Sequence, residues 1–434
     1  MIVPSRRLLW LVGLLLFPVA ALGALLPGSG WLALAMLLAI AAVVLVDLLL
    51  SRGALDDVTL AVASPQRLFL HREQKLPVRI TSLQARRLRV GLALPDSMDA
   101  AFEDTWLGVP GAGEPFAFDW TVTPQRRGGF TIAAGHVETT SQFGLWDLRR
   151  AISLGTEVRV YPNVREGEAL SALQRDQTGV KAIRQVGQGR DFEKLREYLP
   201  GDTIDQIHWK ATARRAQPIT KVFQIERTQE IYVIVDASRL SARMIEGQSA
   251  LDRYLTSALV LGLAAEKRGD LFGLVTFADQ VNGFVRARNG KAHYAACRDA
   301  IYRLESSAVP ADFEELFAFL RGRLRRRALL IVLTALDDPA LAESFCRASR
   351  LLSQKHLVVA GMLAPAGTEP LFSSGAADED EIYRKLGGHL AWRGLRQIEI
   401  DLQRHGVRFR LFSPTKLSSD LIDIYDEIKQ RQLL

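Results

Sequence analysis

Two long apolar runs open the chain, and a short turn separates them. The first extends from Leu8 to Leu26, residues 27–30 form the turn, and the second extends from Trp31 to Leu50. Each run is about 20 residues long, the length of a helix that crosses ~30 Å of hydrocarbon. Residues 1–54 are therefore predicted to form a transmembrane helical hairpin. A signal peptide followed by a buried helix fits less well, because the second run follows at once and a small-residue cleavage site in the right context is missing.

The charges that flank the two runs predict their orientation. Arg6 and Arg7 precede the first run, Arg52 follows the second, and the turn between them carries no charge. Arginine is concentrated in the cytoplasmic flanks of membrane helices, so both chain ends are expected in the cytoplasm. Asp47 is the only charge of the second run and lies near its cytoplasmic end. We expect it to reach the membrane interface rather than to relay protons.

Short strands are predicted between residues 55 and 165. Segments such as 75–80, 88–94 and 117–122 alternate or are briefly apolar, and proline- and glycine-containing turns separate them. Many short strands with regular turns are typical of a small antiparallel β-sandwich. Phe143 and Trp146, which flank Gly144, are expected to fill its core.

From Ile231 onward, apolar strands alternate with helices. The strands are expected near 231–235, 271–277, 328–334, 356–362 and 407–411, with helices between them and a last helix at 416–431. This alternation predicts a mostly parallel, doubly wound α/β sheet over residues 229–434. Residues 166–228, which are more polar, would join it to the β-domain.

Composition narrows the class of partner. The 434 residues carry a formal net charge of +7, and 48% are hydrophobic, which indicates a folded protein of two or three domains. The excess of positive charge would suit nucleic acid or an anionic membrane. The arginines are spread along the chain without a basic helix suited to a groove, so we expect a membrane and no nucleic acid. Cys297 and Cys346 are too few for a disulfide framework or a cysteine-rich metal site.

The most specific motif lies between the two predicted domains, at 187–214. It resembles the signature of the domain-of-unknown-function family 58, whose members are bacterial membrane-linked proteins with a von Willebrand factor A-like domain. Asp205 stands where that family often has arginine. The residues that match the family pattern are Gly187, Gly189, Phe192, Leu195, Arg196, Tyr198, Gly201, Asp202, Ile207, His208, Trp209, Lys210, Ala213 and Arg214.

The resemblance implies a location and a partner, but no reaction. It implies a bacterial inner-membrane protein with a cytoplasmic von Willebrand A-like domain at 229–434. It further implies a partnership with a MoxR-type AAA+ ATPase that remodels a client protein. On this basis we expect a binding or adaptor protein rather than an enzyme, with the identity of the client open.

The resemblance also directs attention to a degenerate metal site (MIDAS-like). The von Willebrand A pattern Asp-x-Ser-x-Ser is met here by Asp236 and Ser238, but Leu240 replaces the second serine. Ala311 stands at the expected threonine, and Asp337 is shifted from the expected aspartate. A hard cation such as Mg²⁺ requires near-octahedral oxygen ligands. We therefore expect no cofactor and at most weak Mg²⁺ binding, with Asp236 and Ser238 capping the next helix instead.

Three interpretations of the signature stay open. In the first, His208, Lys210, Asp202 and Glu226 form a catalytic cluster, with histidine exchanging protons and a desolvated lysine acting as nucleophile. The corresponding function is a membrane-bound hydrolase or transferase at the cell envelope. No partnered serine or cysteine, phosphate loop or metal triad accompanies these residues.

The other two interpretations involve no reaction. In one, Asp202, Arg196 and Arg214 form ion pairs that hold the segment on the A-like domain. Trp209 then fills the core, and His208 satisfies a backbone group. In the other, the segment presents a face to a protein partner, because tryptophan, tyrosine and arginine dominate binding interfaces. Its partner-binding residues would be Arg196, Tyr198, Gly201, Asp202, His208, Trp209, Lys210 and Arg214.

Overall fold

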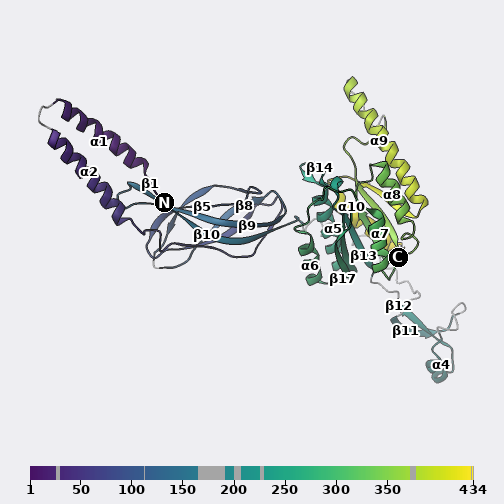
Figure 1. Ribbon diagram of the computed structural model, residues 1–434. Helices are drawn as coiled ribbons and strands as arrows, with labels where there is room; N and C mark the ends of the chain where they lie inside the picture. The colour runs from purple at the N-terminus through teal and green to yellow at the C-terminus, as the bar shows by residue number, and fades with distance from the viewer. Residues whose placement is uncertain are drawn as a thin grey trace. The chain divides into compact units, whose positions relative to one another are not determined.

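The chain forms two compact units, Met1–Asn163 and Val164–Leu434, which are described separately here (Figure 1). The computed structural model describes residues 1–25, 30–111, 113–164, 191–199, 207–224, 229–371, 378–431 and 433. The predicted hairpin and the predicted β-domain both belong to the first unit. Gly187, Gly189, Gly201, Asp202, Asp205 and Glu226 lie outside the described residues.

The first unit begins with two helices where the two apolar runs were predicted. They are α1 (Arg6–Leu25) and α2 (Gly30–Leu50). Their large apolar side chains are exposed, for example 78% of Trp10, 80% of Phe17 and 69% of Trp31. Across the part of the chain that the structure describes, no helix is both long and apolar enough to cross a membrane. The predicted transmembrane hairpin is therefore not confirmed.

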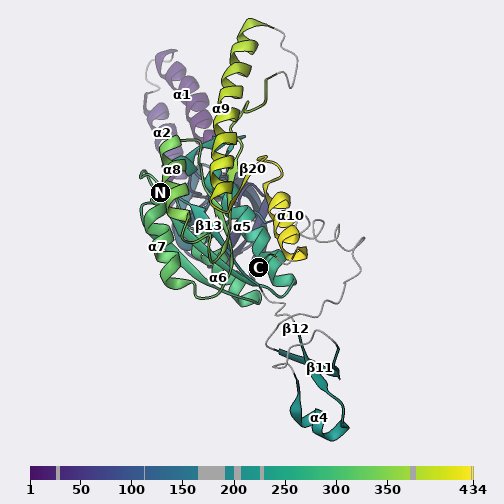
Figure 2. The same cartoon turned by 90° about the vertical axis from the view of Figure 1, so that its right-hand side faces the viewer.

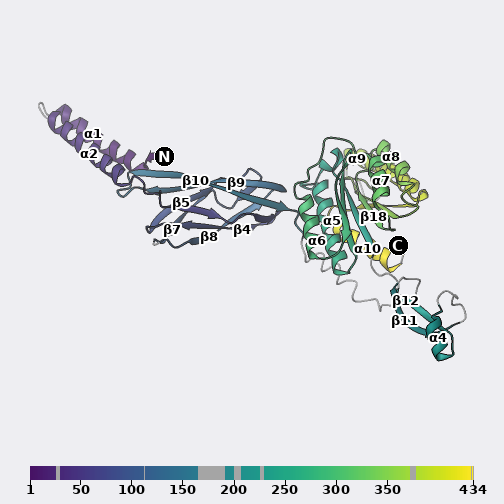
Figure 3. The same cartoon turned by 60° about the horizontal axis from the view of Figure 1, so that its bottom comes forward.

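Two sheets follow, and they share one buried core (Figure 3). The first has the order β1-β10-β9-β5-β7, with β3 paired to β10, and the second has the order β2-β4-β8-β6. Side chains from both sheets, such as Val78 and Trp120 from one and Val137 from the other, are buried together. The strands are β1 (Ile2–Pro4), β2 (Thr59–Val62), β3 (Gln66–Phe69), β4 (Gln74–Thr81), β5 (Arg86–Leu92), β6 (Met98–Ala100), β7 (Asp104–Val109), β8 (Phe116–Pro124), β9 (Gly128–Thr140) and β10 (Trp146–Tyr161).

Asp47 joins the second helix to the β-domain. Its side chain is fully buried, although it lies on a helix whose apolar residues are exposed. The carboxylate accepts hydrogen bonds from the Ser141 hydroxyl at 2.6 Å, the Phe143 amide at 3.0 Å and the Leu145 amide at 3.3 Å. The Trp146 indole donates to the Val44 carbonyl at 3.1 Å. The end of α2 is thus held by the loop between β9 and β10.

These contacts correct two predictions. Asp47 does not reach for an interface, because the loop between β9 and β10 supplies the polar partners that a buried carboxylate needs. Phe143 is 56% exposed rather than in the core, because its backbone amide is turned toward Asp47. Trp146 is partly buried against α2.

The second unit contains a six-stranded sheet in the order β17-β16-β13-β18-β19-β20. All neighbours are parallel except β17, which pairs antiparallel with β16. The predicted mostly parallel, doubly wound sheet is confirmed by this order. Its strands are β13 (Glu230–Asp236), β16 (Leu271–Phe277), β17 (Val281–Arg288), β18 (Leu329–Leu333), β19 (Leu357–Leu363) and β20 (Val407–Phe412).

Helices cover both faces of this sheet (Figure 3). One face packs on α5 (Ala250–Lys267), α6 (Lys291–Ile301) and α10 (Leu417–Gln430), and the other on α7 (Phe313–Arg323), α8 (Pro339–Ser349) and α9 (Glu379–Arg404). Along β13, Val233 faces the first group and Ile234 the second, as expected of a strand buried on both sides. A short 3₁₀ helix, η3 (Arg239–Ala242), and the hairpin β14 (Met244–Ile245) and β15 (Gln248–Ser249) connect β13 to α5.

The first half of helix α9 extends past the sheet (Figure 2). Its 26 residues correspond to about 39 Å. Leu395 and Leu402, in its second half, are buried in the core. Ile382 and Tyr383, in its first half, are 54% and 72% exposed.

We expect Asp47→Ala to loosen the loop between β9 and β10. The substitution leaves the buried Ser141 hydroxyl and the Phe143 and Leu145 amides without an acceptor, at a cost of about 3 kcal/mol. Amide hydrogen exchange at Phe143 and Leu145 should become about 100-fold faster.

A matched control for this experiment is Asp96→Ala, which removes an exposed carboxylate in the same unit. Unchanged exchange in both variants would mean that Asp47 does not hold the loop.

Candidate functional site

The described part of the signature forms a small module of its own. The strands β11 (Asp191–Glu197) and β12 (Ile219–Gln224) pair antiparallel, and the helix α4 (Trp209–Arg215) lies between them in sequence. The Ile219 amide donates to the Thr212 hydroxyl of α4 at 3.0 Å. The Tyr198 amide donates to the Pro218 carbonyl at 3.0 Å. These bonds fix α4 against the start of β12.

His208 begins this helix. Its Nδ1 accepts a hydrogen bond from the Ala211 amide at 3.0 Å, and its own amide donates to the Ile219 carbonyl at 2.7 Å. The first amides of a helix have no partner within the helix, so a side-chain acceptor at this place stabilises the helix start. His208 thus satisfies a backbone group, as one interpretation of the sequence expected.

Four aromatic and apolar side chains of the module are exposed by more than a third, whereas Ile219 is buried. Trp209 is 65% exposed, Leu199 56%, Leu195 40% and Tyr198 38%. The prediction that Trp209 fills the core is wrong, because Trp209 is the first residue of a helix without buried residues. A helix of 7 residues beside a two-stranded sheet is too small to bury an indole ring.

The charged residues of the signature are distributed in the same way. Lys210 and Arg214 are exposed, and Arg196, which is half-buried, donates to the Glu197 carbonyl at 3.1 Å. Because Asp202 lies outside the described residues, the predicted ion pairs with Arg196 and Arg214 stay a prediction. The catalytic cluster of the first interpretation likewise involves Asp202 and Glu226, so only His208 and Lys210 can be placed.

A second candidate site lies at the carboxyl edge of the large sheet. Asp236 ends β13 and Thr334 follows β18, and these neighbouring strands are in register through Val235 and Leu333. The strand order reverses between β13 and β18, which is where ligands bind in open α/β sheets. The Thr334 hydroxyl donates to Asp236 Oδ2 at 2.5 Å.

Asp236 is buried, and its carboxylate organises the loop that follows. Oδ1 accepts from the Ser238 amide at 2.7 Å, and only 2% of the residue is exposed. Burial raises the pKa of Asp236, and the hydrogen bonds from Thr334 and Ser238 oppose this. Asp236 thus holds the loop, but the predicted helix cap is not confirmed, because the side chain of Ser238, the residue that precedes η3, makes no capping hydrogen bond.

The remaining predicted ligands are turned to other partners. Asp337 Oδ2 accepts from Arg243 Nη1 at 2.7 Å, so an arginine supplies its positive partner. Ser241 donates to the Ser238 carbonyl at 2.6 Å, and Ala311 is buried in the core. Within the described ranges, no group of three histidine, cysteine or acidic side chains is placed to hold a metal ion. Oδ2 of Asp337 is paired with Arg243, and both oxygens of Asp236 accept hydrogen bonds, from Ser238 and Thr334.

Thr334 and Arg243 were not identified from the sequence. Thr334 was assigned to the end of a strand, while the expected threonine was placed at position 311. Both Asp236 and Thr334 directly follow buried apolar runs, and parallel neighbouring strands bring such positions to one edge. That signal was present in the sequence. The pairing of Arg243 with Asp337 carries no such signal, since 94 residues separate the two.

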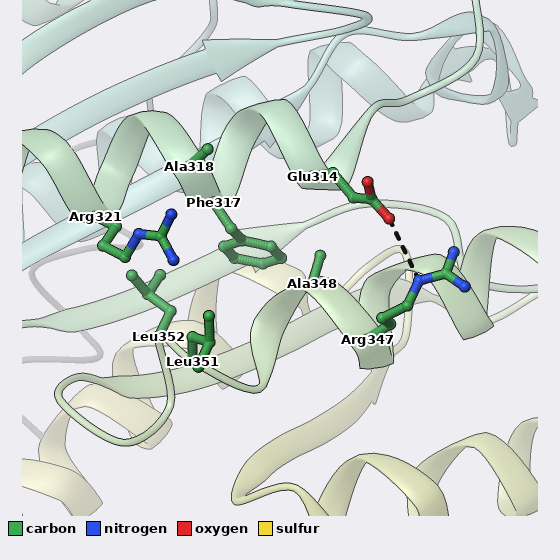
Figure 4. Close-up of a pocket in the computed structure, with 8 residues that line it drawn as sticks. All are labelled: Glu314, Phe317, Ala318, Arg321, Arg347, Ala348, Leu351 and Leu352. Atoms are coloured by element: carbon green, nitrogen blue, oxygen red, sulfur yellow. Dashed lines mark ion pairs between the residues drawn. The ribbon is translucent and has the colours of Figure 1, made fainter.

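The described residues of this unit also line two cavities. A small one of about 230 Å³ lies between α7 and α8, and Figure 4 shows Phe317 at its centre. Glu314 and Arg347 pair across its rim at 3.3 Å. A larger one of about 790 Å³ lies between α8 and α9, and Asp337 belongs to its lining.

Comparison with known families identifies the segment that contains both sites. Residues 194–375 match the family described as "Protein of unknown function DUF58". The resemblance to the domain-of-unknown-function family 58 is confirmed. The matched segment extends from β11 through β19, so it includes the placed signature residues and the carboxyl edge of the sheet.

Proteins with a similar segment occur in bacteria. An uncharacterised protein of Mycobacterium tuberculosis is 23% identical over 179 residues, which cover 40% of this chain and 55% of that protein. The uncharacterised protein YeaD of Bacillus subtilis is 26% identical over 112 residues, which cover 25% of this chain and 28% of YeaD. The chain therefore spans about half the length of the mycobacterial relative that it matches.

Solved structures with a similar part include two from Bacteroides. The conserved hypothetical protein BatB of Bacteroides thetaiotaomicron is 13% identical, with a TM-score of 0.30. The aligned region covers 47% of this chain and 99% of the BatB chain. An aerotolerance-related membrane protein of Bacteroides fragilis is 15% identical, with a TM-score of 0.29. The aligned region covers 46% of this chain and 99% of that protein's chain. The doubly wound fold of the family 58 segment rests on the strand order given above.

We expect Asp236→Asn to change how the free energy of unfolding depends on pH. Asp236 has a raised pKa, so the folded state binds more protons than the unfolded state between the unfolded and the folded pKa values. Its contribution to stability therefore falls as the pH rises through that range. Asparagine keeps the shape without this titration, so the variant should lose that slope and be more stable than the parent at neutral pH.

Urea denaturation between pH 4 and pH 8 measures both effects, with Asp279→Asn as an exposed control. A parent and variant with parallel pH profiles would contradict the assignment.

Proposed function

We propose that this chain is a membrane-associated binding protein, an adaptor that recruits a MoxR-type AAA+ ATPase through its signature module. The supporting observation is the exposure of Trp209, Tyr198 and Leu199 on one small, internally bonded module. Exposed apolar patches rimmed by polar residues mark interaction sites on folded domains. The ATPase is named because of the family resemblance.

The composition of the module suits protein binding. Tryptophan, tyrosine and arginine contribute most of the binding energy in protein interfaces. Here Trp209 and Tyr198 are accompanied by the exposed cations Lys210 and Arg214. The cap made by His208 orders the first turn of α4, so Trp209 is presented with little loss of conformational freedom on binding. The module therefore offers aromatic anchors surrounded by positive charge.

The alternative of a hydrolase or transferase receives less support from the same geometry. A lysine nucleophile requires desolvation, whereas Lys210 is exposed. A general base must have a free nitrogen lone pair, and the Nδ1 lone pair of His208 is used by the Ala211 amide. We therefore retain binding as the function and assign no catalytic residue.

The proposed membrane association involves residues 1–54. In the described parts of α1 and α2, large apolar side chains such as Trp10, Phe17 and Leu45 are exposed, which costs free energy in water and none in lipid. Arg6, Arg7 and Arg52 lie at the ends of the two helices that are far from the turn. With arginine on the cytoplasmic side, both termini lie in the cytoplasm of a bacterium, at its inner membrane. There the ATPase and its ATP are accessible.

The adaptor proposed here works without a bound cation. Arg243 pairs with Oδ2 of Asp337, and the Ser238 amide and the Thr334 hydroxyl donate to the two oxygens of Asp236. Partner binding through the signature would then persist in the presence of a chelator, apart from the Mg²⁺ that ATP itself requires. The client protein is a separate partner, and the signature does not specify it.

We expect Trp209→Ala to weaken ATPase binding without changing the thermal unfolding of the chain. Loss of an aromatic anchor costs about 2 kcal/mol, which corresponds to about 30-fold in affinity. A pull-down of the detergent-solubilised chain with a MoxR-type ATPase and a non-hydrolysable ATP analogue measures this.

Met244→Ala is the control, because Met244 is 65% exposed in the same unit but outside the module. Equal capture of the ATPase by the parent and by Trp209→Ala would contradict the proposed interface. A turnover of any ester or phosphate substrate that depends on His208 would replace it with the enzymatic alternative.

We expect the chain to stay with the membrane fraction after an alkaline carbonate wash, because apolar helices within lipid resist removal by charge. A reporter fused after Arg52 should report the cytoplasm. A periplasmic signal would contradict the orientation, and release by carbonate would contradict the association itself.

A further inference from the structure

The groove between α8 and α9 has the dimensions of a helix-binding site. Its lining on α9 extends from Leu390 to Asp401, which is three helical turns or about 16 Å. On α8 the lining residues include Pro339, Ala342 and Cys346, which lie on one face of the helix. The volume is about 790 Å³, several times that of the cavity between α7 and α8.

Most of the surface of this groove is apolar, and the charged side chains that line it are all acidic. The charged residues of its lining are Asp337, Glu343 and Asp401, and lysine and arginine are absent from that lining. Asp337 is neutralised by Arg243 and Asp401 contacts Arg404 at 3.1 Å, whereas Glu343 is exposed and has no ion pair with another described residue. The chain as a whole carries +7, so this acidic lining is opposite to the general charge.

The pKa of the Cys346 thiol responds to the same carboxylates. It lines the groove and is partly buried, and burial raises the pKa of its thiol, with Asp401 and Glu343 adding to the effect. Both carboxylates therefore act on one point inside the groove. An occupant with a positive charge near an apolar face would relieve this repulsion.

We propose that the groove between α8 and α9 binds an amphipathic helix of a partner protein that carries lysine or arginine beside its apolar face. The walls are helix faces of about two turns on α8 and about three turns on α9, so they match apolar side chains repeated at i, i+4 and i+7. Glu343 and Asp401 contact the cation of the occupant, and Leu390 and Ile398 contact its apolar side chains. This surface is distinct from the signature module, so it suits a client rather than the ATPase.

Gly394 gives a direct way to test the groove. It lies in the lining on α9, and a Cβ atom added there would meet no atom within 4 Å. Gly394→Leu therefore starts its side chain in open space at the groove, and it also favours the helix, because glycine costs about 1 kcal/mol in a helix interior. Gly387→Leu is the matched control, since Gly387 lies on the same helix with open space around it but outside the lining.

The probe is a fluorescein-labelled 14-residue helical peptide with leucine at i, i+4, i+7 and i+11 and lysine beside them. Its binding to the full-length chain in detergent is followed by anisotropy, and comparison between variants removes any binding to the detergent. We expect Gly394→Leu to lower the affinity at least tenfold and Gly387→Leu to leave it unchanged. Replacing the lysines of the peptide with glutamate should abolish binding.

Two further measurements use the charges and the thiol. The double variant Glu343→Gln, Asp401→Asn should lower the affinity at least threefold and keep the thermal unfolding temperature. The peptide should slow the labelling of Cys346 by a thiol reagent, while Cys297, which is fully buried, stays unlabelled. Equal affinity in Gly394→Leu and the parent, equal binding of the lysine and glutamate peptides, or labelling of Cys346 unaffected by the peptide would each overturn the proposal.

Discussion

Both units of this protein depend on the same constraint: a carboxylate that is removed from water must have its acceptors filled. Asp47, Asp236 and Asp270 are each at most 2% exposed. Asp270 accepts from the Gln229 amide at 3.0 Å and from Tyr425 and Lys429, which ties the start of β16 to the segment before β13 and to α10. These three acids connect elements that lie 40 to 160 residues apart, where apolar packing alone would be less specific about register and angle.

The constraint explains which parts of the structure followed from the sequence. Strand and helix order in the second unit followed from apolar runs, because a strand buried on both faces contains mostly apolar residues. The site at the carboxyl edge followed only in part. Asp236 could be identified from its place after a strand, but its partners depend on the order in which strands pair. That order is set by long-range packing, which a local pattern does not contain.

The predictions that proved wrong involve residues whose surroundings are distant in sequence. Asp47 was interpreted from the twenty residues around it, whereas its partners lie 94 to 98 residues away. Trp209 was expected to be buried because tryptophan is large and apolar, whereas the short helix that carries it has no buried residue. Local composition gives the tendency of a side chain to be covered. It does not say whether a neighbouring element supplies the cover.

The second unit therefore separates stability from recognition. The carboxyl edge, where ligands bind in many folds of this kind, is occupied by the protein's own hydrogen bonds among Asp236, Ser238 and Thr334. The surfaces that stay uncovered lie elsewhere, on the signature module with exposed Trp209 and on the groove beside α9. One is aromatic and flanked by cations, and the other is apolar and flanked by carboxylates. Surfaces of such different character select different partners, as the proposed adaptor between an ATPase and a client requires.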